Sequence, residues 1–273
     1  MLLLKLMREI FGRHTPTDLP RDETGCDKLM AELWRRGEPE LALAVYDAAV
    51  ANGLSPCGEP FDAAYRRALV ATSNQPYPLR RRARFHSLYT LLGTVLALEG
   101  TIAECGCFRG MSSHLMLGRL KLADPEFAGR GYRILDSFEG LSEPGNDDAI
   151  PIDHPKAARL GQMCRAGAFA ASLETVQGGL AEFPAVEFHR GWIPQSLAGL
   201  PALRYRFVHL DLDLHRPTLA ALEYFHPRLV EGGLLVCDDY DWPGARKAIE
   251  EFCAGHDVAF DTTPQGQAVL RRA

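Results

Sequence analysis

Residues 206–240 read RFVHLDLDLHRPTLAALEYFHPRLVEGGLLVCDDY, and this stretch decides the fold of the chain. Two apolar runs, 207–210 and 234–237, flank a segment with helical character, and each run ends in acidic residues. Two strands joined by a crossover helix form the right-handed unit of a parallel sheet. The pattern therefore predicts an α/β protein in which both strands bring carboxylates to the same edge of the sheet.

Four aspartates follow these two runs: Asp211, Asp213, Asp238 and Asp239. The carboxyl ends of parallel strands form the edge at which open α/β sheets bind their ligands. Carboxylates crowded at that edge repel one another unless a cation neutralises them or some are protonated. We interpret Asp211, Asp238 and Asp239 as hard oxygen ligands of the kind that magnesium prefers.

The fourth acid, Asp213, lies two residues beyond Asp211 and faces the same side if the strand persists. This position suits a general base. His215 is the competing base, because an imidazole titrates near neutral pH. His209 lies within the apolar run and is interpreted as a histidine of the core.

A second ligand-binding signal is the turn E-C-G-C-F-R-G at residues 104–110, after the first strand of the α/β region. A glycine-rich turn lets the backbone approach a ligand closely and places a helix N-terminus beneath it. The turn has only Gly106 and Gly110, so it is not a dinucleotide fingerprint. An acid at Glu104 suits a cationic group, such as the amine of S-adenosylmethionine. Ser112 or Ser113 is expected to cap the following helix.

Two further residues suggest a nucleoside. Asp136 ends the second strand, where nucleotide-binding sheets place an acid on ribose hydroxyls, although an Asp there can also cap a helix. Trp192 follows the third strand and can either stack on an adenine or fill the core.

Composition limits the class of protein. The chain has 273 residues, is 47% hydrophobic and carries a net charge of −5, so nothing points to nucleic acid as a partner. Seven scattered cysteines favour a reducing compartment. The apolar segment MLLLKLM at the N-terminus is short for a secretory signal, and no run reaches the ~20 residues that cross a bilayer. We therefore expect a cytoplasmic protein without membrane insertion.

The organisation along the chain changes near residue 80. Residues 1–80 are expected to form a helical extension, in which Lys28 to Arg36 and Glu40 to Ala51 resemble one tetratricopeptide hairpin where a stable array needs about three. Residues 73–78 are interpreted as a linker, because two prolines discourage helix. From 81 to 273 helices and strands alternate, with a helix expected over 85–99, which predicts a doubly wound sheet. The polar loop 139–155 is expected to close over bound ligands.

Four blocks of sequence together resemble one family: AECGCFRGMSS, ILDSFEGLSEP, HRGWIPQSL and HLDLDLHRPTLAALEYFHPRLVEGGLLVCDDYDWPGARKAIEEF. They are similar to the macrocin O-methyltransferases, class I S-adenosylmethionine-dependent enzymes that methylate sugar hydroxyls of macrolide and aminocoumarin antibiotics. The resemblance covers roughly residues 81–273. It implies a Rossmann-like, mostly parallel seven-stranded sheet, S-adenosylmethionine and Mg²⁺ as cofactors, and a small glycoside as acceptor.

The resemblance also implies residue roles. The metal would be held by Asp211, Asp238 and Asp239, and the base would be Asp213 or His215. The implied cofactor contacts are Glu104, Cys105, Gly106, Ser112, Asp136, Ser137, Trp192 and Asp211. The chain departs from the family pattern at Cys105 and Cys107, where Thr and an apolar residue are usual. It departs again at His215, where Tyr is frequent.

The function implied is magnesium-dependent O-methylation of a sugar or glycoside, in natural-product or surface-glycan biosynthesis, by an enzyme that we expect to be a homo-oligomer. A nicotinamide-dependent oxidoreductase is the first alternative. It is disfavoured by the missing third glycine and by the absence of a Tyr-x-x-x-Lys pair. A non-catalytic adapter built on a methyltransferase fold is the second, and retention of all four acids disfavours it.

Overall fold

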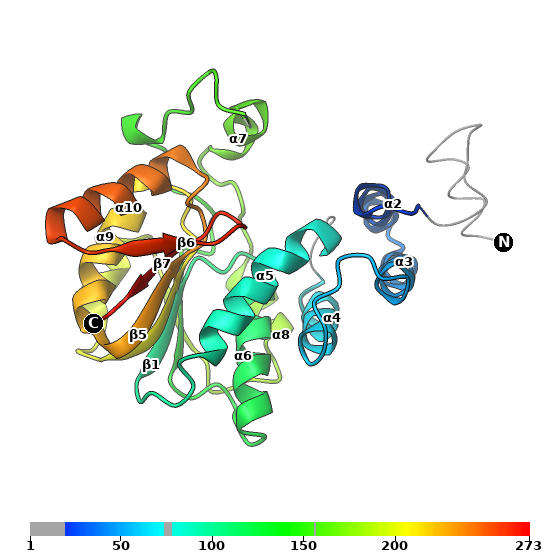
Figure 1. The fold of residues 1–273 in the computed structure, drawn as a ribbon, viewed down its shortest axis with the longest axis horizontal. Coiled ribbons are helices and arrows are strands. Elements are labelled where there is room, and N and C mark those ends of the chain that lie inside the picture. The colour runs from blue at the N-terminus through cyan, green and yellow to red at the C-terminus, as the bar shows by residue number, and fades with distance from the viewer. Residues whose placement is uncertain (1–19, 74–77, 156) are drawn as a thin grey trace. The chain divides into compact units, whose positions relative to one another are not determined.

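The computed structural model describes residues 20–73, 78–155 and 157–273 (Figure 1). It consists of two compact units, residues 1–86 and 87–273. The predicted domain boundary at residue 80 stays a prediction. The apolar N-terminal segment and most of the predicted linker lie outside the described residues.

The second unit is built on a seven-stranded sheet with the order β3-β2-β1-β4-β5-β7-β6. Strands β1 to β5 pair in parallel, whereas β7 pairs antiparallel with β5 and β6. The strands are β1 (Thr101–Cys105), β2 (Tyr132–Asp136), β3 (Glu187–Arg190), β4 (Tyr205–Leu210), β5 (Leu229–Cys237), β6 (Phe260–Thr262) and β7 (Ala268–Arg271). This topology confirms the predicted Rossmann-like, mostly parallel sheet of class I methyltransferases.

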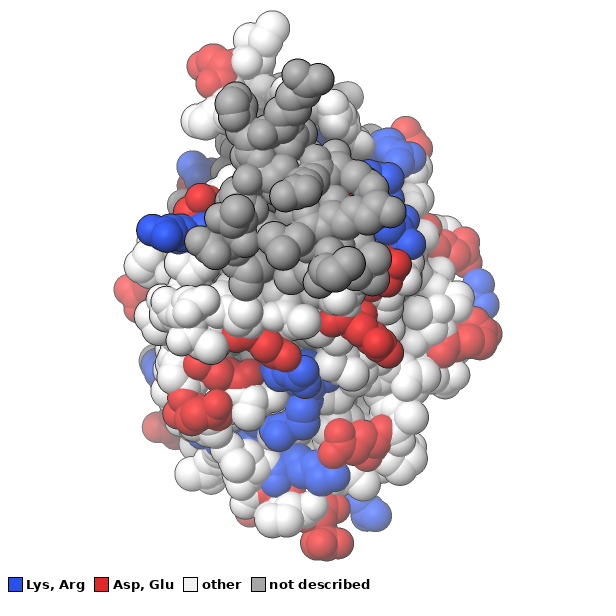
Figure 2. All heavy atoms as spheres, turned by 90° about the vertical axis from the view of Figure 1, so that its right-hand side faces the viewer, with Lys and Arg blue, Asp and Glu red and all other residues white. Residues whose placement is uncertain are grey.

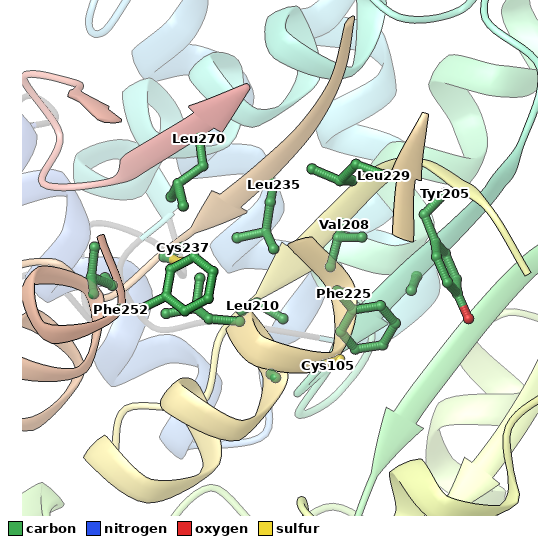
Figure 3. Packing of buried hydrophobic residues seen from close by; sticks show 14 of the residues in the cluster. Cys105, Tyr205, Val208, Leu210, Phe225, Leu229, Leu235, Cys237, Phe252 and Leu270 are labelled. Carbon is green, nitrogen blue, oxygen red and sulfur yellow. The ribbon is translucent and has the colours of Figure 1, made fainter. Parts of the chain in front are cut away.

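Helices cover both faces of this sheet, because the buried central strands are apolar on both sides. The helices α9 (His215–Phe225) and α10 (Pro243–His256) pack on one face. Their contact with the sheet is a continuous apolar core, in which Phe225 and Phe252 lie over Val208, Leu210 and Leu235 (Figure 3). The other face is covered by α6 (Met111–Ala123), by α8 (Leu173–Gly179) and by the second half of α5 (Pro78–Gly93). The remaining elements of this unit are α7 (Ala157–Met163) and the 3₁₀ turns η2 (Asn146–Asp148), η3 (Gln195–Gly199) and η4 (His226–Arg228).

Three sequence expectations about element ends were wrong. Helix α6 begins directly after Gly110, which has a left-handed backbone (φ 85°), so Ser112 and Ser113 lie buried inside the first turn and do not cap it. Strand β5 begins at Leu229, before the apolar run 234–237 that was expected to form the strand, and therefore includes Gly232 and Gly233. Helix α5 begins at Pro78, where a proline fits the first turn, and ends at Gly93, so it does not span 85–99.

The first unit contains the helices α2 (Glu23–Arg35), α3 (Pro39–Ala51) and α4 (Phe61–Thr72), and the beginning of α5, in agreement with the expected helical character. Its centre is Arg82, whose side chain is fully buried and donates to Ser55 O (3.0 Å), to the Tyr46 hydroxyl and to Asp62. Three aromatic rings lie 5.4–5.6 Å from its guanidinium: Tyr46, Phe61 and Tyr65. These contacts compensate the burial of the charge.

None of the helices in the described parts of the chain is long and apolar enough to cross a membrane. On the face shown in Figure 2, the described Lys and Arg side chains lie among Asp and Glu side chains.

Candidate active site

Three of the four predicted acids lie together at the carboxyl edge of the sheet. One carboxylate oxygen from each of Asp211, Asp213 and Asp239 lies within 4.8 Å of the other two. The backbone turns sharply at Asp213 (φ 59°), and its N–H donates to Asp239 Oδ2 at 3.1 Å. This bond holds the end of β4 against the end of β5. Residues 211–213, called the acid turn below, therefore present their carboxylates beside Asp239.

The structure does not bring Asp238 into this group. Its Oδ1 accepts a hydrogen bond from Gln267 Nε2 (2.7 Å) and lies 3.7 Å from His209 Nε2. Consecutive residues at a strand end point to opposite sides, so Asp238 faces the interior while Asp239 joins the cluster. The ligand role predicted for Asp238 stays a prediction.

His215 is also turned away from the three acids. It is the first residue of α9, and its Nε2 lies 2.9 Å from Glu251 Oε2 on α10. Its Nδ1 lies 3.8 Å from Asp147 Oδ2. Both ring nitrogens thus face carboxylates outside the acid cluster.

The glycine-rich turn has a steric reason for its first glycine. Gly106 has φ 81°, and a Cβ at this position would lie 1.9 Å from the carbonyl oxygen of Asp211. Only glycine combines this backbone conformation with such close packing. The neighbouring Cys105 side chain is fully buried in the core, and its carbonyl oxygen accepts the N–H of Asp211 at 2.9 Å. The glycine-rich turn and the acid turn are therefore packed directly against each other.

Asp136, at the end of β2, binds the glycine-rich turn. Its Oδ2 accepts the N–H of Cys107 and its Oδ1 accepts the N–H of Phe138, both at 2.7 Å. The next residue, Ser137, is buried and donates to Gly140 O at 2.8 Å. A half-buried carboxylate has about four acceptor positions, so Asp136 can hold these two donors and still accept from a ligand.

The Glu104 carboxylate, near the end of β1, is engaged by protein groups. Its side chain is fully buried, and Oε2 accepts from Ser113 Oγ (2.5 Å) and from the Tyr132 hydroxyl (2.8 Å). Its Oε1 lies 3.3 Å from His209 Nδ1. The amine-binding role of Glu104 stays a prediction, and its observed contacts are with the protein interior.

His209 therefore lies between two buried carboxylates, those of Glu104 and Asp238. Burial by itself lowers the pKa of His209, but its interactions with the two acids outweigh burial and raise the pKa to about 10. The imidazole is a cation at neutral pH. The expectation of a core histidine is correct, but the sequence did not reveal that it carries a charge or that it bridges the two strand ends.

The remaining predicted contacts lie around this edge. Trp192 is 41% exposed and donates from Nε1 to Gly140 O at 3.1 Å, which excludes the alternative that it fills the core. Ser112 is buried in the first turn of α6. Burial raises the pKa values of the Cys105 and Cys107 thiols, with further increases from neighbouring acids, so both remain protonated and serve as small core side chains.

A family model described as Macrocin-O-methyltransferase (TylF) matches residues 32–264. The chain belongs to this family. The membership places it among S-adenosylmethionine-dependent O-methyltransferases and confirms the resemblance seen in the sequence. The match also extends beyond that resemblance, because it begins within α2 of the helical extension.

Two relatives of this TylF-family chain have names that specify the methylation reaction. It is 33% identical over 182 residues to 8-demethyl-8-(2,3-dimethoxy-alpha-L-rhamnosyl)-tetracenomycin-C 4'-O-methyltransferase of Streptomyces olivaceus, covering 64% of this chain and 67% of the relative. It is 30% identical over 168 residues to mycinamicin III 3''-O-methyltransferase of Micromonospora griseorubida, covering 59% of this chain and 63% of the relative. The matches thus span about two thirds of the relatives' own length.

Solved structures share the fold of this TylF-family chain. The O-methyltransferase NovP aligns with a TM-score of 0.59 at 20% identity, over 92% of this chain and all of NovP. The calicheamicin methyltransferase CalS11 aligns with a TM-score of 0.58 at 20% identity, over 78% of this chain and 93% of CalS11. At these identities the likeness concerns the fold.

Proposed function

We propose that this protein transfers a methyl group from S-adenosylmethionine to a hydroxyl group of a sugar or glycoside, with Mg²⁺ held at the acid cluster. The observation that supports this proposal best is the convergence of Asp211, Asp213 and Asp239 beside the glycine-rich turn of a methyltransferase fold. The proposed acceptor class rests on the two relatives above, whose names specify sugar-bearing natural products.

The residues present fit S-adenosylmethionine. Gly106 lets the glycine-rich turn pack closely on Asp211, and Asp136 offers acceptor positions for ribose hydroxyls at the edge where such sheets bind nucleosides. Trp192 offers an exposed aromatic ring at the end of the neighbouring strand β3. We propose these three residues as the cofactor contacts best supported by the structure.

The residues also fit Mg²⁺. This ion is usually held by one or two carboxylates, with water and substrate completing its octahedron. Asp211 and Asp239 end adjacent strands and meet this requirement, and we propose them as the ligands. When bound, Mg²⁺ would lower the pKa of an acceptor hydroxyl and fix its oxygen for attack on the methyl group.

We assign Asp213 as the general base that takes the proton of that hydroxyl. Its carboxylate lies within the same 4.8 Å group and is half-buried, so an acceptor can reach it. The competing His215 is engaged by Glu251 at 2.9 Å. The leaving group is S-adenosylhomocysteine, and the products are the methyl ether and a proton on Asp213.

We predict that Asp136→Ala weakens binding of S-adenosylhomocysteine by about tenfold to a hundredfold, because one charge-assisted partner of the ribose is lost. The change also removes the acceptor of the Cys107 and Phe138 amides, so the turn itself loosens. Calorimetric titration measures the effect. Magnesium affinity measured in the same preparation should change little, and an unaltered affinity for S-adenosylhomocysteine would remove the assignment.

The proposed function is tested by offering purified protein ³H-methyl-labelled S-adenosylmethionine with a panel of rhamnosides, macrolide glycosides and nucleotide sugars. We expect a labelled methyl ether from at least one glycoside. Binding of NADH in place of S-adenosylhomocysteine would instead support the oxidoreductase alternative. Binding of S-adenosylhomocysteine without transfer to any acceptor would support the adapter.

A further inference from the structure

The loop between β2 and α8 is tied closed at its base. Leu141 N donates to Ala168 O at 2.8 Å, and Gly167 N donates to Leu141 O at 2.9 Å. Residues 141–168, called the 141–168 loop below, are described apart from residue 156. The loop also shares a small apolar core with the start of α10, in which Leu160 packs with Trp242 and Ala245. The loop is therefore docked on the strand β5–helix α10 connection.

Among its described residues, the 141–168 loop has one buried acid, Asp148. Asp148 is 7% exposed, and its two oxygens accept different backbone N–H groups. Oδ2 accepts from Gly145 at 2.7 Å, within the loop. Oδ1 accepts from His215 at 2.6 Å, at the first residue of α9. A single carboxylate thus joins the loop to the helix that follows the acid turn.

Helix α9 depends on this distant acceptor. Its own N-cap residue, Leu214, makes no side-chain capping bond, so the first N–H groups of the helix need partners from elsewhere. An aspartate is a favourable partner, because its charge also complements the positive end of the helix dipole. Asp148 supplies from another segment the cap that the local sequence lacks.

Gly244 shows how tightly this contact is built. It lies in the first turn of α10, and a Cβ there would sit 2.0 Å from Asp148 Oδ1 and 3.0 Å from His215 N. No larger residue fits without displacing the carboxylate. Three elements, the loop turn η2, α9 and α10, therefore meet at Asp148.

Two carboxylates consequently hold the backbone at and just after the C-terminal end of the acid turn. At Asp213 its N–H is bound by Asp239, and two residues later the N–H of His215 is bound by Asp148. Cys164 provides a second sign that the loop lies close to the acids. Its Sγ is 4.0 Å from Asp148 O, and its pKa is raised by burial and then by the charges of Asp148 and Asp213.

We propose that Asp148 is a positioning residue that couples the docking of the 141–168 loop to the geometry of the acid turn. The inference rests on the proposed function, because it assigns the coupling to the site where methyl transfer takes place. When the loop is docked, Asp148 fixes the backbone after Asp213. When the loop lifts, α9 loses its cap and the backbone just after the acid turn loses the bond at His215.

The test uses hydrogen exchange and metal titration on the full chain. For Asp148→Ala we expect faster exchange both in the 141–168 loop and at residues 211–216. We also expect Mg²⁺ affinity, measured by calorimetry with S-adenosylhomocysteine present, to fall by about tenfold or more, the size of one lost bond to a charged acceptor. Affinity for S-adenosylhomocysteine without metal should change little. Asp148→Asn keeps an oxygen that can accept the N–H of His215, so it should retain part of the exchange protection and of the Mg²⁺ affinity that Asp148→Ala loses.

Two matched controls separate coupling from general damage. Gly244→Ala should reproduce the Asp148→Ala changes. Gly255→Ala lies in the same helix but has open space where the added Cβ would lie, so it should not reproduce them. Asp153→Ala removes an exposed acid of the same loop and should leave residues 211–216 unchanged. Slow exchange in β1 and β4 verifies that each variant keeps the fold.

The inference is overturned if Asp148→Ala frees the loop while exchange at residues 211–216 and Mg²⁺ affinity stay as in the unaltered protein. It is also overturned if Gly244→Ala behaves like Gly255→Ala. The exchange measurement needs no acceptor and no turnover. Failure of methyl transfer with an intact coupling therefore contradicts the proposed function alone, and methyl transfer with no coupling contradicts the inference alone.

Discussion

Replacing Asp213 with Asn lowers turnover by about 10²–10⁴-fold, the loss expected for a general base, and leaves the magnesium concentration required for half-maximal activity unchanged. An amide oxygen keeps the shape of the side chain but accepts a proton poorly. The backbone bond from Asp213 N to Asp239 is retained, so the acid turn should keep its conformation. Steady-state rates across a magnesium titration measure both quantities.

Asp211→Asn and Asp239→Asn serve as controls for this prediction. Each replaces a charged ligand by a neutral one, so each should raise the magnesium requirement, since a hard cation binds an amide less well. If Asp213→Asn shifts the magnesium requirement in the same way, Asp213 is a ligand and its assignment as base is wrong. If His215→Ala causes the loss of turnover and Asp213→Asn does not, His215 is the base.

Replacing His209 with Leu should lower the free energy of unfolding by about 3–5 kcal/mol, because it removes the cation between two buried acids. Glu104 and His209 have exposed side-chain fractions of 0% and 1%, so water cannot compensate the lost partner. Urea denaturation in metal-free buffer measures the change. His189→Leu is the matched control. This histidine also lies in a strand, but burial lowers its pKa. Its neighbour Arg133, 3.1 Å from Nε2, keeps its ion pair with Glu187, so loss of His189 leaves no buried charge unpaired.

The stabilisation by His209 also has a defined pH dependence. Because its pKa in the folded state is raised to about 10 from an ordinary value of 6.5, its contribution is complete below about pH 6.5. The contribution is lost as the pH rises through about 10, where the folded protein releases the proton. His209→Leu should therefore flatten the stability profile between these two values. A profile that falls equally in both proteins would contradict the charged assignment.

Much of the sheet edge could be predicted from local sequence. The apolar runs that end in Asp211, Asp136 and Cys105 mark β4, β2 and β1, because a buried parallel strand needs a continuous apolar segment and ends where polar residues begin. Because parallel strands share one carboxyl edge, a ligand site at that edge could also be predicted from the sequence. The helix ends were less predictable. Gly110 begins α6 through its backbone conformation, which no side-chain capping pattern reveals.

The orientation of individual acids needed the three-dimensional pairing. Glu104 stands opposite His209 in the register of β1 and β4, and only that register shows that the two side chains meet inside the protein. Asp238 and Asp239 illustrate the same limit, because their alternation is predictable but the partner Gln267 comes from a distant segment. The role of Asp148 could not be read from sequence at all, since the amide that it accepts belongs to His215, far along the chain.

Methyl transfer with and without magnesium tests the central claim most directly. The protein is stripped with EDTA, offered labelled S-adenosylmethionine and a glycoside that it accepts, and assayed before and after addition of Mg²⁺. We predict that the stripped protein forms almost no methyl ether, that Mg²⁺ restores the rate, and that Asp211→Asn needs more Mg²⁺ for the same rate. Full activity of the stripped protein, equal in the Asp211→Asn variant, would contradict the account.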